Sequence, residues 1–151
     1  MPRSEYYEPT FVPGERPEPS IILDAERILS LLLRAEVMMT KVDRVRYASR
    51  IICEIEDVIR EFSLAYDFED DRLYHLKRMW GHVAVFLRLF RIIGDMNAIR
   101  VRTEHDPMTP DQIKLELLNA VASLDEGATK WKRSVERTIK QQRKGTTGSE
   151  G

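Results

Sequence analysis

Proline is absent from the chain between Pro19 and Pro107, and the only glycines in that span are Gly81 and Gly94. These two residue types most often interrupt regular secondary structure, so their scarcity leaves room for long uninterrupted elements. Apolar residues in the span recur at steps of three and four, which is the spacing along one helix face, and no alternating strand pattern competes with it. The sequence therefore predicts an all-α fold.

The apolar spacing divides the chain into four predicted helices. Ser20 is the expected N-cap of the first helix. The polar residues 40–43 are the expected corner before the second, although a helix that runs on with a kink stays an alternative. Residues 67–71 (DFEDD) supply a turn before the third helix, and residues 109–112 (TPDQ) match a capping box that opens the fourth. The expected core positions are, in chain order, Ile21, Ala25, Ile28, Leu32, Ala35, Met39; Val45, Ala48, Ile52, Ile55, Ile59, Phe62, Tyr66; Leu73, Leu76, Trp80, Val83, Leu87, Phe90; and Ile113, Leu117, Ala120, Leu124, Ala128, Trp131, Val135.

Four amphipathic helices with short connections predict an antiparallel four-helix bundle over residues 21–144. The chain of 151 residues, 42% of them apolar, is long enough to bury one core. Residues 1–20 hold five of the seven prolines and are expected to form an extended arm. Residues 145–151 (GTTGSEG) are expected to form a disordered tail.

The end of the third predicted helix carries more apolar residues than one face of a small bundle normally uses. The additional residues are Phe86, Leu89, Ile92 and Ile93. We expect them to form an oligomer interface, and a broad face buried within one chain is the alternative.

The histidines and the single cysteine give no sign of catalysis. None of the three histidines follows a glutamate by three residues, which is the spacing that di-iron bundles use. His75 and His82 are separated by about 10 Å along a helix, at about 1.5 Å per residue, and are expected to be solvated rather than to share a metal ion. Cys53 is expected to be an inert, partly buried thiol. The sequence thus predicts a protein that is not an enzyme and has no metal site and no cofactor.

The charges are divided unequally along the chain, although the net charge is only −1. Residues 1–71 contain 9 basic and 16 acidic residues, a net charge of −7, whereas residues 72–151 contain 15 and 9, a net charge of +6. An anionic partner is therefore expected to meet the second half of the chain.

Basic residues form one row along the end of the fourth predicted helix, at steps of three and four. Like charges four residues apart destabilise a helix, and the helix dipole favours cations only in the last turn, so helix stability does not explain the row. Successive phosphates of a nucleic acid would match it. The acidic half of a neighbouring subunit is the alternative. The basic row consists of Lys130, Arg133, Arg137, Lys140 and Lys144.

Several segments resemble one known family, the accessory variability determinant (Avd) of diversity-generating retroelements. This family belongs to the four-helix-bundle superfamily of rRNA intervening-sequence proteins. The similar segments are residues 44–66 (RVRYASRIICEIEDVIREFSLAY), 76–96 (LKRMWGHVAVFLRLFRIIGDM) and 108–113 (MTPDQI), together with Trp131 and the basic end that follows it.

The resemblance implies a homopentameric barrel of four-helix protomers. It also implies a non-catalytic accessory protein that binds a reverse transcriptase and its template RNA in mutagenic cDNA synthesis. The residues that it assigns to the partner or the RNA are Arg88, Arg91, Lys130, Arg133, Arg137 and Lys140.

Two other functions stay open at the level of the sequence. One is an rRNA-associated or ribosome-associated four-helix bundle, and the other is a protein-only oligomeric helical adaptor. No apolar run approaches the roughly 18 residues of a membrane span, and the N-terminus lacks the layout of a signal peptide. A cytoplasmic protein without membrane contact is therefore expected.

Overall fold

The computed structural model describes residues 19–96 and 98–150, with side chains for residues 20–92 and 98–144. Within these ranges all regular structure is helical, which confirms the predicted all-α class. The predicted arm lies outside the described residues except for Pro19 and Ser20. These two residues are already helical, so Ser20 is not the cap. The four long helices are α2 (Pro19–Glu36), α4 (Ser49–Asp67), α5 (Arg72–Met96) and α6 (Pro110–Glu150).

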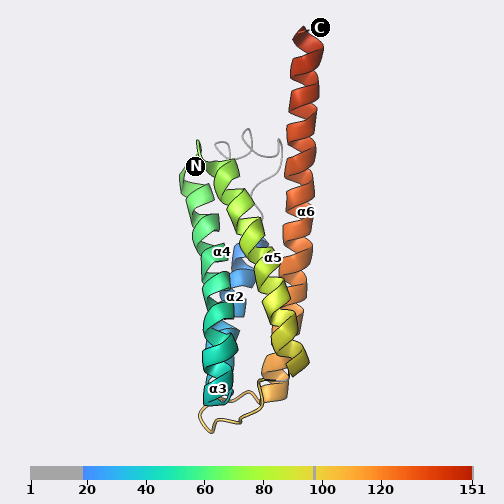
Figure 1. Cartoon of the computed structure of the whole chain (residues 1–151). Coiled ribbons are helices and arrows are strands. Elements are labelled where there is room, and N and C mark those ends of the chain that lie inside the picture. Colours follow the sequence, from blue (N-terminus) through green and yellow to red (C-terminus); the bar gives the residue numbers. More distant parts are fainter. Residues whose placement is uncertain (1–18, 97, 151) are drawn as a thin grey trace.

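The long helices alternate in direction along the chain (Figure 1). Helix α4 packs along α5, and α2 packs along α6 and more lightly against α4, whereas α5 and α6 contact each other only slightly. The C-terminal part of α6 extends beyond the ends of α4 and α5 (Figure 1). No helix in the described ranges is both long and apolar enough to cross a membrane.

The core follows the predicted stripes most closely in the first and last helices. Every expected core position between Ile21 and Met39, and every one between Ile113 and Val135, is buried. Trp131 closes the core with edge-on contacts to Phe62 and Trp80, whose ring centroids lie 6.1 and 6.5 Å away.

The corner after α2 differs from the prediction in position and in form. Helix α2 ends at Glu36, and Thr40 caps a short helix α3 (Lys41–Asp43) by accepting a hydrogen bond from the Asp43 N–H at 3.2 Å. A π-helical turn, η1 (Arg44–Ala48), then leads into α4. The wider π turn shifts the register of the chain, so Val45 does not continue the buried face and is 69% exposed. The prediction that Val45 belongs to the core is wrong.

The connection from α5 to α6 is longer than the predicted short loops, since α5 ends at Met96 and α6 begins at Pro110. The N–H groups of Arg100 and Val101 both donate to the Met38 carbonyl oxygen, at 3.0 and 2.7 Å. Ala98 and Ile99, which precede these residues in the chain, are buried. These contacts hold the connection against the corner after α2.

Helix α6 begins with the predicted capping box. The Gln112 N–H donates to Thr109 Oγ1 at 3.2 Å, and the Thr109 N–H donates to Gln112 Oε1 at 2.8 Å. These reciprocal bonds confirm the start of the helix. At the other end the helix continues to Glu150 instead of ending at residue 144, so residues 145–150 of the predicted tail are helical.

Candidate functional site

The basic row lies on one exposed side of α6. All five of its residues are exposed, whereas Trp131 and Val135 of the same segment are buried. Lys130 Nζ lies 3.0 Å from Glu126 Oε1, and Arg137 Nη2 donates to Ser134 Oγ at 3.4 Å. Both contacts are within the helix and on the surface, so they leave the cations open to an external anion.

Arg88 and Arg91 are exposed on α5, but the structure does not bring them to the basic row. Trp80 of α5 contacts Trp131 of α6, and the two helices run in opposite directions. Arg88 and Arg91 therefore lie beside an earlier part of α6, on the far side of the tryptophan pair from Lys140. They form a second, separate group of cations.

The residues expected at the oligomer interface are not all on the surface. Phe86 is fully buried and its ring stacks on that of Phe90 at 5.9 Å, so it belongs to the core of its own chain. Leu89 is half-buried against this core. Ile92 is 48% exposed, and the Ile93 side chain lies outside the described residues. Sequence spacing did not show that Phe86 is buried within its own chain, because spacing identifies a face of one helix and not its neighbours.

A row of charged and polar side chains, which we call the polar seam, joins α4 to α5. His75 and His82 of α5 are half-buried in it, so the prediction that they are solvated is wrong. Each faces an acidic residue of α4, because the two helices run antiparallel from the turn that joins them. The members of the polar seam are Glu54, Asp57 and Glu61 of α4, and His75, Arg78 and His82 of α5.

The spacing of these residues is a signal of the polar seam that is present in the sequence. Glu54 and Glu61 are seven residues apart, as are His75 and His82. A separation of seven residues returns to the same side of a helix. In an antiparallel pair of helices joined by a short turn, the residues nearer the turn meet each other, here Glu61 and His75. The residues farther from the turn also meet each other, here Glu54 and His82.

The end of the polar seam nearer the turn, which we call its inner end, is a buried ion pair. The Glu61 side chain is only 5% exposed and accepts a hydrogen bond from Arg78 Nε at 3.0 Å. His75 Nδ1 lies 3.2 Å from the same carboxylate oxygen. The hydrogen bond to Glu61 raises the pKa of Arg78, whose guanidinium also lies 5.5 Å from the centre of the Tyr74 ring. A permanent cation therefore compensates the buried carboxylate.

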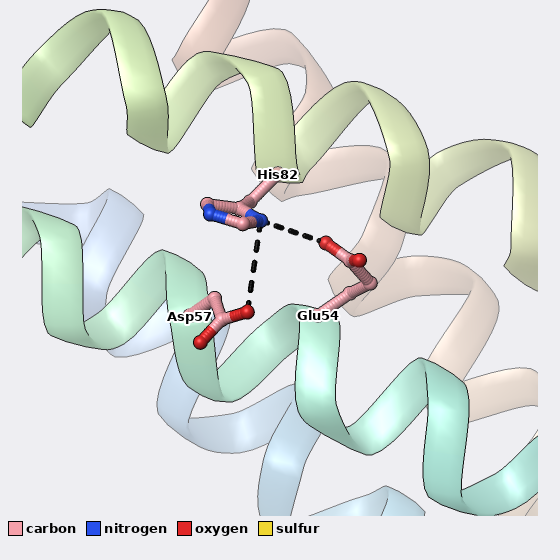
Figure 2. Close-up of side chains that lie close together, drawn as sticks. All are labelled: Glu54, Asp57 and His82. Atoms are coloured by element: carbon pink, nitrogen blue, oxygen red, sulfur yellow. Dashed lines mark hydrogen bonds and ion pairs between the residues drawn. The ribbon is translucent and has the colours of Figure 1, made fainter.

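The outer end of the polar seam holds two carboxylates and one imidazole (Figure 2). His82 Nδ1 lies 2.9 Å from Glu54 Oε2 and 3.7 Å from Asp57 Oδ2. Asp57 also forms an ion pair with Arg60, the next turn of the same helix. Glu54, Asp57 and His82 each present a ligand atom, and these atoms lie within 4.8 Å of one another. Such a set of donors could hold a divalent cation.

Cys53 is exposed on α4, not partly buried as predicted. An exposed thiol is open to oxidants and to metal ions. It follows that experiments on the neighbouring acidic residues need a variant in which this thiol is removed.

Comparison with known proteins gave no match, since no family model, no curated protein and no solved structure is similar to this chain.

Proposed function

We propose that this protein is a non-catalytic accessory protein of a diversity-generating retroelement. In this role it binds the reverse transcriptase and the template RNA and so supports mutagenic cDNA synthesis, in the cytoplasm. The observation that carries the proposal is the exposed basic row on α6, on a chain whose helical segments resemble the Avd family.

The basic row suits a phosphate backbone rather than a specific base sequence. Its cations recur on successive helical turns, and the end of α6 that carries Lys140 and Lys144 projects beyond α4 and α5 (Figure 1). Cations that neutralise several phosphates release counterions, which gives affinity without reading bases. Template choice would then come from the reverse transcriptase, and the accessory protein would supply sequence-independent affinity.

The proposal includes an assembly of several copies. In it the alternating helices form a four-helix bundle, and five bundles form a barrel, as the family resemblance implies. Val85 and Ile92 support a shared surface on α5, because they are seven residues apart, lie on the same side of the helix and are 44% and 48% exposed. Leu89 lies half-buried between them.

Light scattering tests the assembly. The expected mass is several times the chain mass of 17.7 kDa, and five times for a pentamer. Ile92→Glu should lower this mass, whereas Val42→Glu, the same kind of change at an exposed apolar residue of α3, should not. A monomer at micromolar concentration would rule out the barrel.

RNA affinity measured across a salt series tests the function. In the test variant Lys130, Arg133, Arg137 and Lys140 are all changed to Gln, which propagates a helix about as well as Lys and Arg. Each lost contact with single-stranded RNA should flatten the slope of log affinity against log salt by about 0.7. The matched control changes four exposed cations at the opposite end of the molecule to Gln, namely Lys41, Arg44, Arg46 and Arg50.

The two variants carry the same net charge, so only the position of the lost cations differs between them. Each is measured with and without the reverse transcriptase encoded nearest to the gene. Equal slopes for wild type and the basic-row variant in both settings would contradict the proposal. Retention of ribosomal RNA without any reverse transcriptase would favour the rRNA-associated alternative. Protein binding that is insensitive to salt and retains no RNA would favour the adaptor.

A further inference from the structure

The outer end of the polar seam has the chemistry and the geometry of a metal-binding site. We propose that Glu54, Asp57 and His82 bind one divalent transition-metal ion between α4 and α5 (Figure 2). This site goes beyond the RNA and reverse-transcriptase binding proposed above and does not depend on it.

The two helices hold the three ligands in a fixed arrangement. Glu54 and Asp57 are three residues apart on one side of α4, and His82 comes from the facing side of α5. Helices α4 and α5 lie side by side (Figure 1) and contact each other more extensively than any other pair of the described helices. All three side chains are about one quarter exposed, so the site is sheltered by the helices while one side stays open to water.

The distances between the donor atoms suit a small transition-metal ion. Zinc bound at about 2.0–2.1 Å in a tetrahedron places its ligand atoms about 3.3 Å apart. The 2.9 and 3.7 Å distances from His82 Nδ1 to the two carboxylates lie on either side of that value. Small side-chain rotations therefore bring the three atoms around one ion, with water in the remaining position. In this state a bond from Nδ1 to the metal replaces its hydrogen bond to Glu54.

The donor types select the class of metal. An imidazole nitrogen suits zinc, nickel, copper or iron, whereas magnesium and calcium take oxygen ligands almost exclusively. Loss of His82 should therefore weaken zinc binding. In a site that held magnesium through its carboxylates alone, the same loss would change the magnesium affinity little.

The charges at the two ends of the polar seam differ in a way that favours a cation at the outer end. At the inner end Arg78 supplies a positive charge directly to Glu61. At the outer end two carboxylates face one imidazole, and the neighbouring cation Arg60, which is 64% exposed, pairs with Asp57. A divalent ion would compensate both carboxylates at once and tie α4 to α5.

Calorimetric titration of zinc chloride into the full chain tests the proposal. The chain carries Cys53→Ser, because the exposed thiol next to Glu54 could bind zinc by itself. We expect saturable binding of one zinc ion per chain. In this background His82→Gln and Glu54→Gln should each weaken binding at least about tenfold, since losing even an outer partner of a metal ligand costs about 10–100-fold.

Two matched controls use exposed residues of the same types. His105→Gln and Glu56→Gln should leave the zinc affinity unchanged. Zinc should also raise the midpoint of thermal unfolding in the parent and in both controls, but not in the two ligand variants. Circular dichroism checks that each variant is folded, and Asp57→Asn replaces any variant that is not.

Three results would overturn the proposal. The first is the absence of saturable zinc binding in the Cys53→Ser chain. The second is zinc binding that His82→Gln and Glu54→Gln leave unchanged. The third is displacement of zinc by an equal concentration of magnesium, which would show an acidic patch without a contribution from the imidazole. None of these measurements involves RNA or a reverse transcriptase, so they do not bear on the proposed function.

Discussion

The two ends of the polar seam pair the same residue types and differ in burial and in charge. At the inner end Glu61 is 5% exposed, and both Arg78 and His75 contact it. At the outer end Glu54 and Asp57 are about one quarter exposed and share His82. A buried carboxylate with a permanent cation contributes to folding only while the pair is intact. Two partly exposed carboxylates with one imidazole keep the capacity to bind a cation, so we infer that the inner end serves stability and the outer end serves binding.

The largest expected effect comes from breaking the inner end. Glu61→Ala removes the shared acceptor of His75 and Arg78 and should lower the free energy of unfolding by about 2–3 kcal/mol, less than for a fully buried pair because Arg78 reaches water. Glu54→Ala at the outer end should cost less than about 1 kcal/mol in metal-free buffer. Urea unfolding at neutral pH measures both, and equal losses would remove the distinction between the two ends.

A smaller effect is expected from removing the cation. Arg78→Met keeps an aliphatic stem over Tyr74 but leaves Glu61 with His75 as its partner, so the chain should be destabilised. Arg60→Met, at the exposed cation of the outer end, should change the free energy of unfolding by less than about 0.5 kcal/mol. The midpoints of urea unfolding give this order directly. A larger loss for Arg60→Met than for Arg78→Met would contradict it.

A third ion pair provides a reference with a defined pH range. Arg34 Nε donates to Asp106 Oδ2 at 2.9 Å, and the Met108 N–H donates to Oδ1 at 2.9 Å. The hydrogen bond from Arg34 and then that from Met108 lower the pKa of Asp106 from 3.8 to about 2. Because the folded state holds this proton less tightly, the contribution to stability is present above pH 3.8 and is lost as the pH falls toward 2.

Asp106→Asn should therefore be less stable than wild type at pH 5 to 7 by a constant amount. The difference between the two should shrink below about pH 4 and be small near pH 2. Urea unfolding at a series of pH values measures this difference, provided that both proteins are still folded in acid. A difference that stays the same down to pH 2 would show that the asparagine acts through packing and not through charge.

The sequence predicted the helices and most of the core because apolar spacing follows helical geometry directly. The first and last stripes, ending at Met39 and Val135, are buried at every expected position. The prediction that Val45 belongs to the core failed because the π turn η1 changes the helical register. Residues 44–48 contain no glycine or proline to signal this turn. The spacing of three and four assumes a regular helix, so it fails where the helix is irregular.

The site was harder to predict than the core, for a physical reason. Spacing identifies which residues share a face of one helix, but the partner of that face depends on how the helices pack. His82 lies to one side of the predicted stripe, and only the packing of α4 places Glu54 and Asp57 against it. The basic row was easier to predict, since steps of three and four place its cations along one side of a single helix, and all five are exposed on α6.

A small effect of the opposite sign is expected at Gly81, which precedes His82 and lies between the two ends of the polar seam. It is exposed in the middle of α5, and a methyl group added there meets no atom within 4 Å. Gly81→Ala should therefore stabilise the chain by about 0.5–1 kcal/mol, because alanine loses less backbone entropy in a helix. Both ends of the polar seam should keep their behaviour, so the zinc affinity and the cost of Glu61→Ala should stay the same in this background.

Gly81 is also one helical turn from Val85 on α5, where we propose that copies meet. If Gly81→Ala instead lowers both the stability and the mass in light scattering, the glycine is in close contact with a second copy. In that case contacts between copies, and not the polar seam alone, contribute to the stability of α5.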